Sequence, residues 1–144
     1  GHSQGRYDEG RGEGQDVKAA LEYVATLKEV DAKRIGLCGY SAGAAFSLPV
    51  CYADGRVAAI GAISPPFDMF DSSCIAKCDK TLLLVSGGYD DFTPAKRLLD
   101  YCKTLGDVAE YELIEGADHF WGGYEPALAA RVVAFFKRIL TDRV

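Results

Sequence analysis

Basic clusters and long apolar runs are both missing from this sequence of 144 residues. Its lysines and arginines are scattered and its formal net charge is -5, so we expect no surface for nucleic acid or anionic lipid. No apolar run reaches the roughly 18 residues of a transmembrane helix, and no signal or transit segment is recognisable. We therefore expect a soluble cytoplasmic protein with neither nucleic acid nor a membrane as a partner.

Paired metal-ligand spacing is also absent. The five cysteines are an odd number, and none of them forms the C-x-x-C pair of a structural zinc site. Cys74 and Cys78 are the only close pair, and we interpret them as ordinary thiols rather than as metal or redox groups. The sequence thus predicts free thiols in a reducing compartment and no metal site.

The remaining composition is that of a globular protein, with 49% hydrophobic and 26% charged residues, which allows one core and a single domain over residues 1–144. Strand and helix patterns alternate along the chain, and this order predicts an α/β fold with a parallel sheet flanked by helices. The expected strands span 34–39, 57–63, 81–85 and 109–114, and the expected helices span 16–27, 42–51 (ending near Pro49), 94–105 and 126–139.

Both outer strands have a distinctive pattern. In the strand at 109–114, apolar and acidic residues alternate, which is typical of a half-exposed strand at a sheet edge. The strand that contains Leu37 is apolar but has no sequence-adjacent partner on its upstream side, so we expect a second exposed edge there.

A G-x-S-x-G pattern, Gly39-Tyr40-Ser41-Ala42-Gly43, lies between an apolar run and a run of small residues. This context is typical of a strand, a sharp turn and a helix, which together expose a nucleophilic serine. Ser3 lies in the same five-residue pattern, but a polar, glycine-rich segment follows it and no strand can precede it. Ser41 is therefore the candidate nucleophile, with a tightly packed structural turn as the alternative.

To act as a nucleophile, a serine hydroxyl needs a base that takes its proton, and a third group must orient that base. The sequence has two histidines, and His119, which follows the last expected strand, is the candidate base rather than an ordinary surface histidine. Asp90 and Asp91 compete as the orienting acid after the third strand. We prefer Asp90 for its spacing from Gly87 and Pro94, since Asp91 is better placed to face solvent or cap the next helix.

The order serine, aspartate, histidine is the chain order of the α/β-hydrolase triad. Together with Asp8–Gly10, Gly39–Gly43, Ile63–Pro66, Gly87–Pro94 and Gly116–Phe120, it resembles the dienelactone-hydrolase-like α/β-hydrolase family of small serine hydrolases. The resemblance covers essentially the whole chain and matches the C-terminal two-thirds of that domain. It implies an α/β-hydrolase fold lacking its N-terminal strands, cleavage of small carboxylic esters through an acyl-enzyme, and no cofactor.

The resemblance also implies an oxyanion site. The backbone N–H of Ala42, at the start of a helix, supplies one donor, whereas family members take the second from a loop after an early strand that is absent here. The alternative is therefore a catalytically impaired or inactive hydrolase-fold fragment that serves as an interaction or assembly module. Such a module would self-associate through the exposed edge at Leu37.

Aromatic residues after the strand ends are candidates for a substrate pocket, although core positions are the more common alternative for such residues. The acyl and alcohol groups of the substrate do not follow from the sequence. The candidates are Tyr40, Phe67, Phe92 and Trp121. Met69 and Phe70, which lie in the same segment as Phe67, could line the pocket with it.

Overall fold

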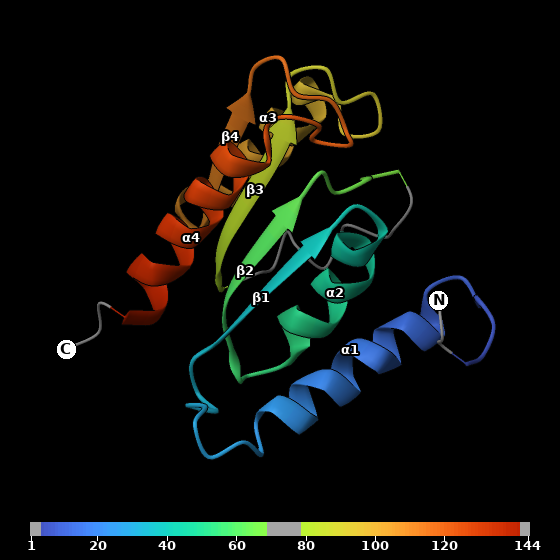
Figure 1. Cartoon of the computed structure of the whole chain (residues 1–144), viewed down its shortest axis with the longest axis vertical. Helices are drawn as coiled ribbons and strands as arrows, with labels where there is room; N and C mark the ends of the chain where they lie inside the picture. The colour runs from blue at the N-terminus through green and yellow to red at the C-terminus, as the bar shows by residue number, and fades with distance from the viewer. Residues whose placement is uncertain (1–3, 69–78, 142–144) are drawn as a thin grey trace.

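The computed structural model describes residues 4–68 and 79–141, and within them it has one four-stranded parallel sheet in the order β1-β2-β3-β4. The strands are β1 (Ile35–Tyr40), β2 (Val57–Ile63), β3 (Thr81–Gly87) and β4 (Ala109–Ile114). The helices are α1 (Arg11–Val24), α2 (Ala42–Ala53), α3 (Ala95–Leu105) and α4 (Glu125–Thr141), with a 3-10 turn, η2 (Gly106–Val108), before β4. Figure 1 shows the strands side by side, and the predicted parallel sheet flanked by helices is confirmed.

The two central strands are buried on both faces, as their continuous apolar sequences predict. On one face, alternate residues such as Ile60 and Leu82 belong to a core cluster with α1, α2 and α3. On the other face, Ala59 and Leu83 pack with Phe135 and its neighbours from α4. One hydrophobic layer on each side of the sheet thus fixes the strands from which the loops emerge.

Several element boundaries differ from the sequence expectation, and three of the differences have a clear physical cause. Pro49 does not end α2, which continues to Ala53, because buried Leu48 and Cys51 pack into the core and outweigh the backbone hydrogen bond that proline cannot donate. The first helix begins earlier, at Arg11, where the Asp8 carboxylate accepts the N–H of Gly12 at 2.6 Å. The third strand extends to Gly87 because Ser86 and Gly87 still pair with β4.

Two strands are edges of the sheet within the described residues. The predicted edge position of β4 is confirmed, and most of its residues are half-buried. The outer side of β1 has no neighbouring strand in the part of the chain that the structure describes, and a groove of about 450 Å³ lies there between β1 and α1. Self-association through this edge stays a prediction.

The cysteines that the structure describes include free thiols at Cys38 and Cys102. Burial raises the pKa of Cys102 to about 11, so this thiol is protonated at neutral pH. Cys74 and Cys78 lie outside the described residues.

Over residues 4–68 and 79–141, no helix combines the length and the hydrophobicity needed to cross a membrane.

The carboxyl end of β3 touches the loop after β4. A Cβ atom on Gly87 would come within 2.3 Å of the carbonyl oxygen of Ala117 and within 2.6 Å of its carbonyl carbon. Both are backbone atoms, which cannot rotate away. Glycine is therefore needed at position 87 for the loop that contains His119 to lie against the end of β3.

We expect Gly87→Ala to destabilise the chain by about 1–3 kcal/mol, the usual cost of overpacking, because the loop at Ala117 must move. Gly55→Ala is the matched control, since a Cβ there has no atom within 4 Å. Urea unfolding followed by circular dichroism measures the difference. A Gly87→Ala midpoint equal to that of Gly55→Ala would contradict the steric argument.

Candidate active site

Ser41 occupies a strained turn between β1 and α2. Its backbone has φ 51° and ψ −125°, a conformation that residues other than glycine rarely adopt. The turn is held at both ends, because the Ser41 N–H donates to the carbonyl of Ile63 at 2.9 Å and its own carbonyl accepts the N–H of Ala44 at 2.9 Å. Gly39 allows the close approach, since a Cβ on it would lie 2.7 Å from the Cα of Ala44. The Ser41 side chain thus projects from a fixed position at the carboxyl edge of the sheet.

The structure brings His119 to Ser41 across 78 positions of sequence. The Oγ atom of Ser41 lies 2.9 Å from Nε2 of His119, which is within hydrogen-bond range. His119 is only 7% exposed, while Ser41 is half-buried, so the imidazole is shielded and the hydroxyl is reachable.

The other imidazole nitrogen meets Asp90. Nδ1 of His119 lies 3.0 Å and 3.1 Å from the two carboxylate oxygens of Asp90. Because an ionised carboxylate only accepts hydrogen bonds, Nδ1 carries the proton and Nε2 is left to accept the hydroxyl proton of Ser41. Asp91 is exposed, so of the two aspartates Asp90 is the one in contact with His119.

The Asp90 carboxylate is fully buried and surrounded by donors. It accepts the backbone N–H of Phe92 at 3.0 Å and that of Thr93 at 2.8 Å, and the Ser86 hydroxyl approaches it at 3.4 Å. A buried charge is tolerated only when it is hydrogen-bonded in this way. The turn at 90–93 therefore keeps the carboxylate in a defined orientation beneath the imidazole.

Two side chains that lie outside this chain of hydrogen bonds hold the loop of His119. The hydroxyl of Tyr40, the residue before Ser41, donates to the backbone carbonyl of His119 at 2.8 Å. The indole N–H of Trp121 donates to the hydroxyl of buried Ser64, at the end of β2, at 3.1 Å. Sequence reasoning missed both contacts, and the only signal for them was that Tyr40 directly precedes the candidate nucleophile and Trp121 lies two residues after the candidate base.

The four aromatic pocket candidates divide into two pairs. Phe67 and Trp121 are 5% and 3% exposed and belong to the two core clusters, which is the alternative noted for such residues. Tyr40 and Phe92 are exposed and lie beside His119, with ring centroids 5.6 Å and 4.6 Å from the imidazole. Met69 and Phe70 lie outside the described residues.

Phe120 is a further exposed ring at this place, and sequence reasoning did not single it out. It is 73% exposed and meets the imidazole of His119 edge-on at 5.5 Å. Its position directly after the candidate base was the available signal.

The N-terminus of α2 lies directly behind Ser41. Ala42 is the first residue of this helix, and the first N–H groups of a helix have no acceptor within it. The N–H of Ala42 is thus available at the end of the helix where the macrodipole favours negative charge.

Within the described ranges, no group of three or more His, Cys, Asp or Glu side chains is placed to hold a metal ion.

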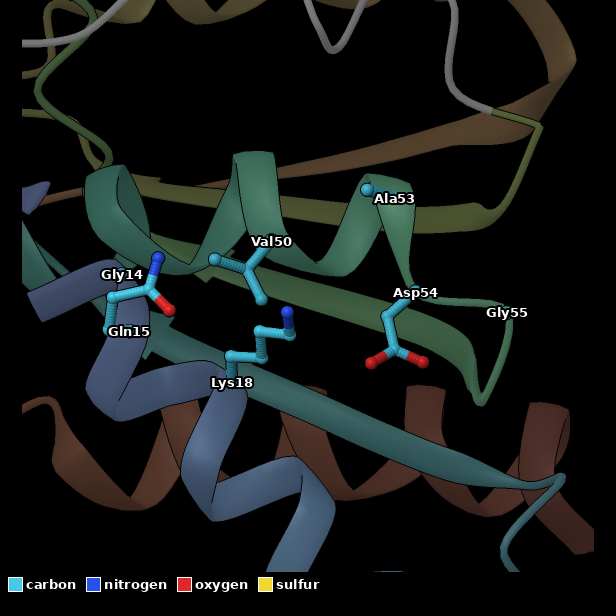
Figure 2. Close-up of a pocket in the computed structure, with 7 residues that line it drawn as sticks. All are labelled: Gly14, Gln15, Lys18, Val50, Ala53, Asp54 and Gly55. Carbon is cyan, nitrogen blue, oxygen red and sulfur yellow. The ribbon is translucent and has the colours of Figure 1, made fainter.

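A separate cavity of about 390 Å³ lies between α1 and the C-terminal end of α2. Figure 2 shows Gln15, Lys18 and Asp54 among the residues that line it. The hydrogen bond from Arg56 lowers the pKa of Asp54 to about 2, so this carboxylate is ionised and already paired. The cavity offers no nucleophile paired with a base, and the site at Ser41 remains the candidate.

One family model and several known proteins are similar to this chain. Residues 8–124 match the model of the dienelactone hydrolase family. The uncharacterised protein RP471 of Rickettsia prowazekii (strain Madrid E) is 30% identical in an alignment of 129 positions, and the match covers 84% of this chain and 54% of that protein.

Two solved structures have the same arrangement of elements. A putative α/β hydrolase from Agrobacterium tumefaciens, ATU1826, superposes with a TM-score of 0.88 at 27% identity, covering 96% of this chain and 65% of that one. An α/β serine hydrolase homologue from Coxiella burnetii has a TM-score of 0.81 at 33% identity, covering 94% and 64%.

The chain spans about half the length of the curated relative, with 54% covered, and somewhat under two-thirds of each solved structure, with 65% and 64% covered. The family match nevertheless includes each segment that contributes to the site, from the loop before α1 to the loop after β4. The sheet is thus that of an α/β-hydrolase fold, and the chain belongs to the dienelactone hydrolase family.

Proposed function

We propose that this chain contains the nucleophile, base and acid of a serine hydrolase that cleaves small carboxylic esters. The observation that supports the proposal is the continuous chain of hydrogen bonds from the Ser41 hydroxyl through His119 to the buried Asp90 carboxylate. Acyl transfer requires a nucleophile within hydrogen-bond distance of a base that a third group orients. Oγ of Ser41 lies 2.9 Å from Nε2 of His119, which fits this requirement.

In the proposed reaction, Oγ of Ser41 attacks the ester carbonyl while Nε2 of His119 takes its proton. Asp90 stabilises the imidazolium that forms, and the N–H of Ala42 donates to the carbonyl oxygen as it becomes negative. His119 then gives the proton to the departing alcohol oxygen, which leaves Ser41 acylated. A water molecule, deprotonated by the same imidazole, then attacks the acyl carbonyl, and the imidazolium returns the proton to Oγ of Ser41 as the bond from the carbonyl carbon to Oγ breaks and the carboxylic acid departs.

The alternative is a hydrolase fold without turnover that acts as an assembly module. The outer side of β1, which has no neighbouring strand among the described residues, favours it. The two proposals differ in the reactivity of Ser41, because an active hydroxyl reacts with a fluorophosphonate and an unactivated one does not.

We expect a fluorophosphonate probe to label the wild-type chain and to leave Ser41→Ala unlabelled, because the variant lacks the hydroxyl that lies 2.9 Å from Nε2 of His119. Ester turnover should fall by roughly 10⁶-fold in the variant if the three side chains act as a unit. Gel fluorescence and a spectrophotometric ester assay measure both effects. Equal labelling of the two proteins, or labelling of neither, would favour the module without turnover.

Replacing Asp90 by Asn should lower kcat by roughly 10⁴-fold, because the amide no longer holds the imidazole in the tautomer that leaves Nε2 unprotonated. Asp91→Asn is the matched control next in sequence, and its exposed side chain should leave kcat within about twofold of wild type. Steady-state kinetics on the two variants decides between the aspartates. A larger loss for Asp91→Asn would reverse our assignment.

Removing the Tyr40 hydroxyl with Tyr40→Phe should lower kcat about tenfold with little change in KM, since one hydrogen bond to the carbonyl of His119 is lost. Burial and the charges of Asp90 and Asp118 raise the pKa of Tyr40 above its ordinary value, so the donor is present at neutral pH and is lost only when the phenol ionises at strongly alkaline pH. A pH profile of kcat should therefore fall at alkaline pH in the wild type and lack this step in the variant. Identical profiles would remove the positioning role of Tyr40.

A further inference from the structure

Two phenylalanine rings stand beside the imidazole of His119 and face solvent; we call Phe92 and Phe120 the aromatic rim. The rings lie 4.6 Å and 5.5 Å from the imidazole centroid, and their own centroids are 6.5 Å apart at 80°. Phe92 is 56% and Phe120 is 73% exposed. Neither ring belongs to a hydrophobic core cluster.

The backbone of the rim is fixed although its side chains are exposed. The N–H of Phe92 donates to the Asp90 carboxylate at 3.0 Å, and the N–H of Phe120 donates to the Asp118 carboxylate at 2.9 Å. The two rings are thus presented from hydrogen-bonded turns. A phenylalanine ring left in water forgoes the favourable free energy of burial, and exposed apolar groups gathered at one place mark a binding surface.

The position of the rim relative to the reacting atoms indicates which part of a substrate it contacts. In the proposed reaction, the proton taken from Ser41 Oγ resides on Nε2 of His119 and passes to the ester oxygen as the bond from the carbonyl carbon to that oxygen breaks. The departing group must therefore lie against the imidazole, where the rim is, while the acyl group stays attached to Ser41.

The charges near the rim are negative. Asp90 lies under the imidazole, and Asp118 holds the backbone of Phe120. Both carboxylates act electrostatically on Tyr40, whose ring also borders His119. A leaving group with its own negative charge would be repelled here.

We propose, on the basis of the proposed ester hydrolysis, that the aromatic rim binds the leaving group and that the preferred leaving group is a neutral, flat aromatic alcohol of the phenol or naphthol class. Aromatic rings pair edge-on or offset with such a group, and the planes of the two rim rings are nearly perpendicular, at 80° to each other.

The test compares acetate esters that differ only in the alcohol: phenyl and 1-naphthyl acetate as neutral aromatic esters, ethyl acetate as an aliphatic ester and 4-carboxyphenyl acetate as an anionic one. Each kcat/KM of the full chain is divided by the rate constant of the same ester with hydroxide, so that intrinsic reactivity cancels. We expect the corrected values for the two neutral aromatic esters to exceed the others by tenfold or more.

The variants Phe92→Leu and Phe120→Leu keep an apolar side chain and remove the ring. Combined, they should reduce the corrected preference for phenyl over ethyl acetate by roughly tenfold, which corresponds to about 1.4 kcal/mol of aromatic contact. Tyr89→Leu is the matched control, because Tyr89 is 74% exposed but lines a different cavity. Phenyl butyrate should respond to the rim variants as phenyl acetate does, since the acyl group lies elsewhere.

The outcomes separate this inference from the proposed function. Diisopropyl fluorophosphate has no aromatic ring, so its reaction with Ser41 reports the nucleophile alone. If Ser41 reacts and esters are cleaved, but the rim variants keep the wild-type preference, the rim proposal is overturned while the hydrolase remains. If Ser41 does not react, the proposed function fails and the rim proposal fails with it. Should the double variant not fold by circular dichroism, each single variant is expected to lower the preference by about threefold, and an unchanged preference in both overturns the proposal.

Discussion

Parallel pairing of the strands is the constraint on which the site depends. Tyr40 pairs with Ile63 and Gly87 pairs with Ile114, so β1 to β4 all end at the same edge of the sheet. The residues that follow these ends therefore meet in space, although Ser41 and His119 are separated by 78 positions. The layers of apolar side chains on both faces hold the strands in this register, and a shift of one strand would separate the hydroxyl from the imidazole.

The buried charge of Asp90 links the stability of the fold to the geometry of the site. A carboxylate whose side chain is fully buried costs several kcal/mol unless donors surround it. Nδ1 of His119 is one of those donors, together with the N–H groups of Phe92 and Thr93. The orientation of the imidazole is therefore required by the folded state itself, whether or not a substrate is present.

The sequence was informative where chemistry depends on local pattern. Ser41 could be found from a turn whose flanking glycines and neighbouring strand and helix are adjacent in sequence. His119 could be found because the sequence has only two histidines, and spacing favoured Asp90 over Asp91.

Local patterns were less informative about loop paths and exposure. The bond from the Tyr40 hydroxyl to the carbonyl of His119 depends on how the loop after β4 lies over the first strand. No local rule describes that path. Two residues depart from the usual behaviour of their type. Pro49 lies inside α2 because the packing of that helix outweighs the low helix propensity of proline. The ring of Phe120 is exposed, and the cause that we propose is that it belongs to a binding surface.

In the loops around His119, backbone N–H groups form the hydrogen bonds that hold the loops, whereas the side chains at positions 92 and 120 are exposed. At position 92 the backbone N–H donates to the Asp90 carboxylate, whereas the phenylalanine ring is exposed and lies beside the imidazole. At position 120 the N–H binds Asp118, and again the ring is exposed. Because any residue except proline supplies the same N–H, side chains at these two positions can change without disturbing the chain of hydrogen bonds from Asp90 to Ser41. The proposed proton transfer and the proposed choice of leaving group would therefore be physically separable.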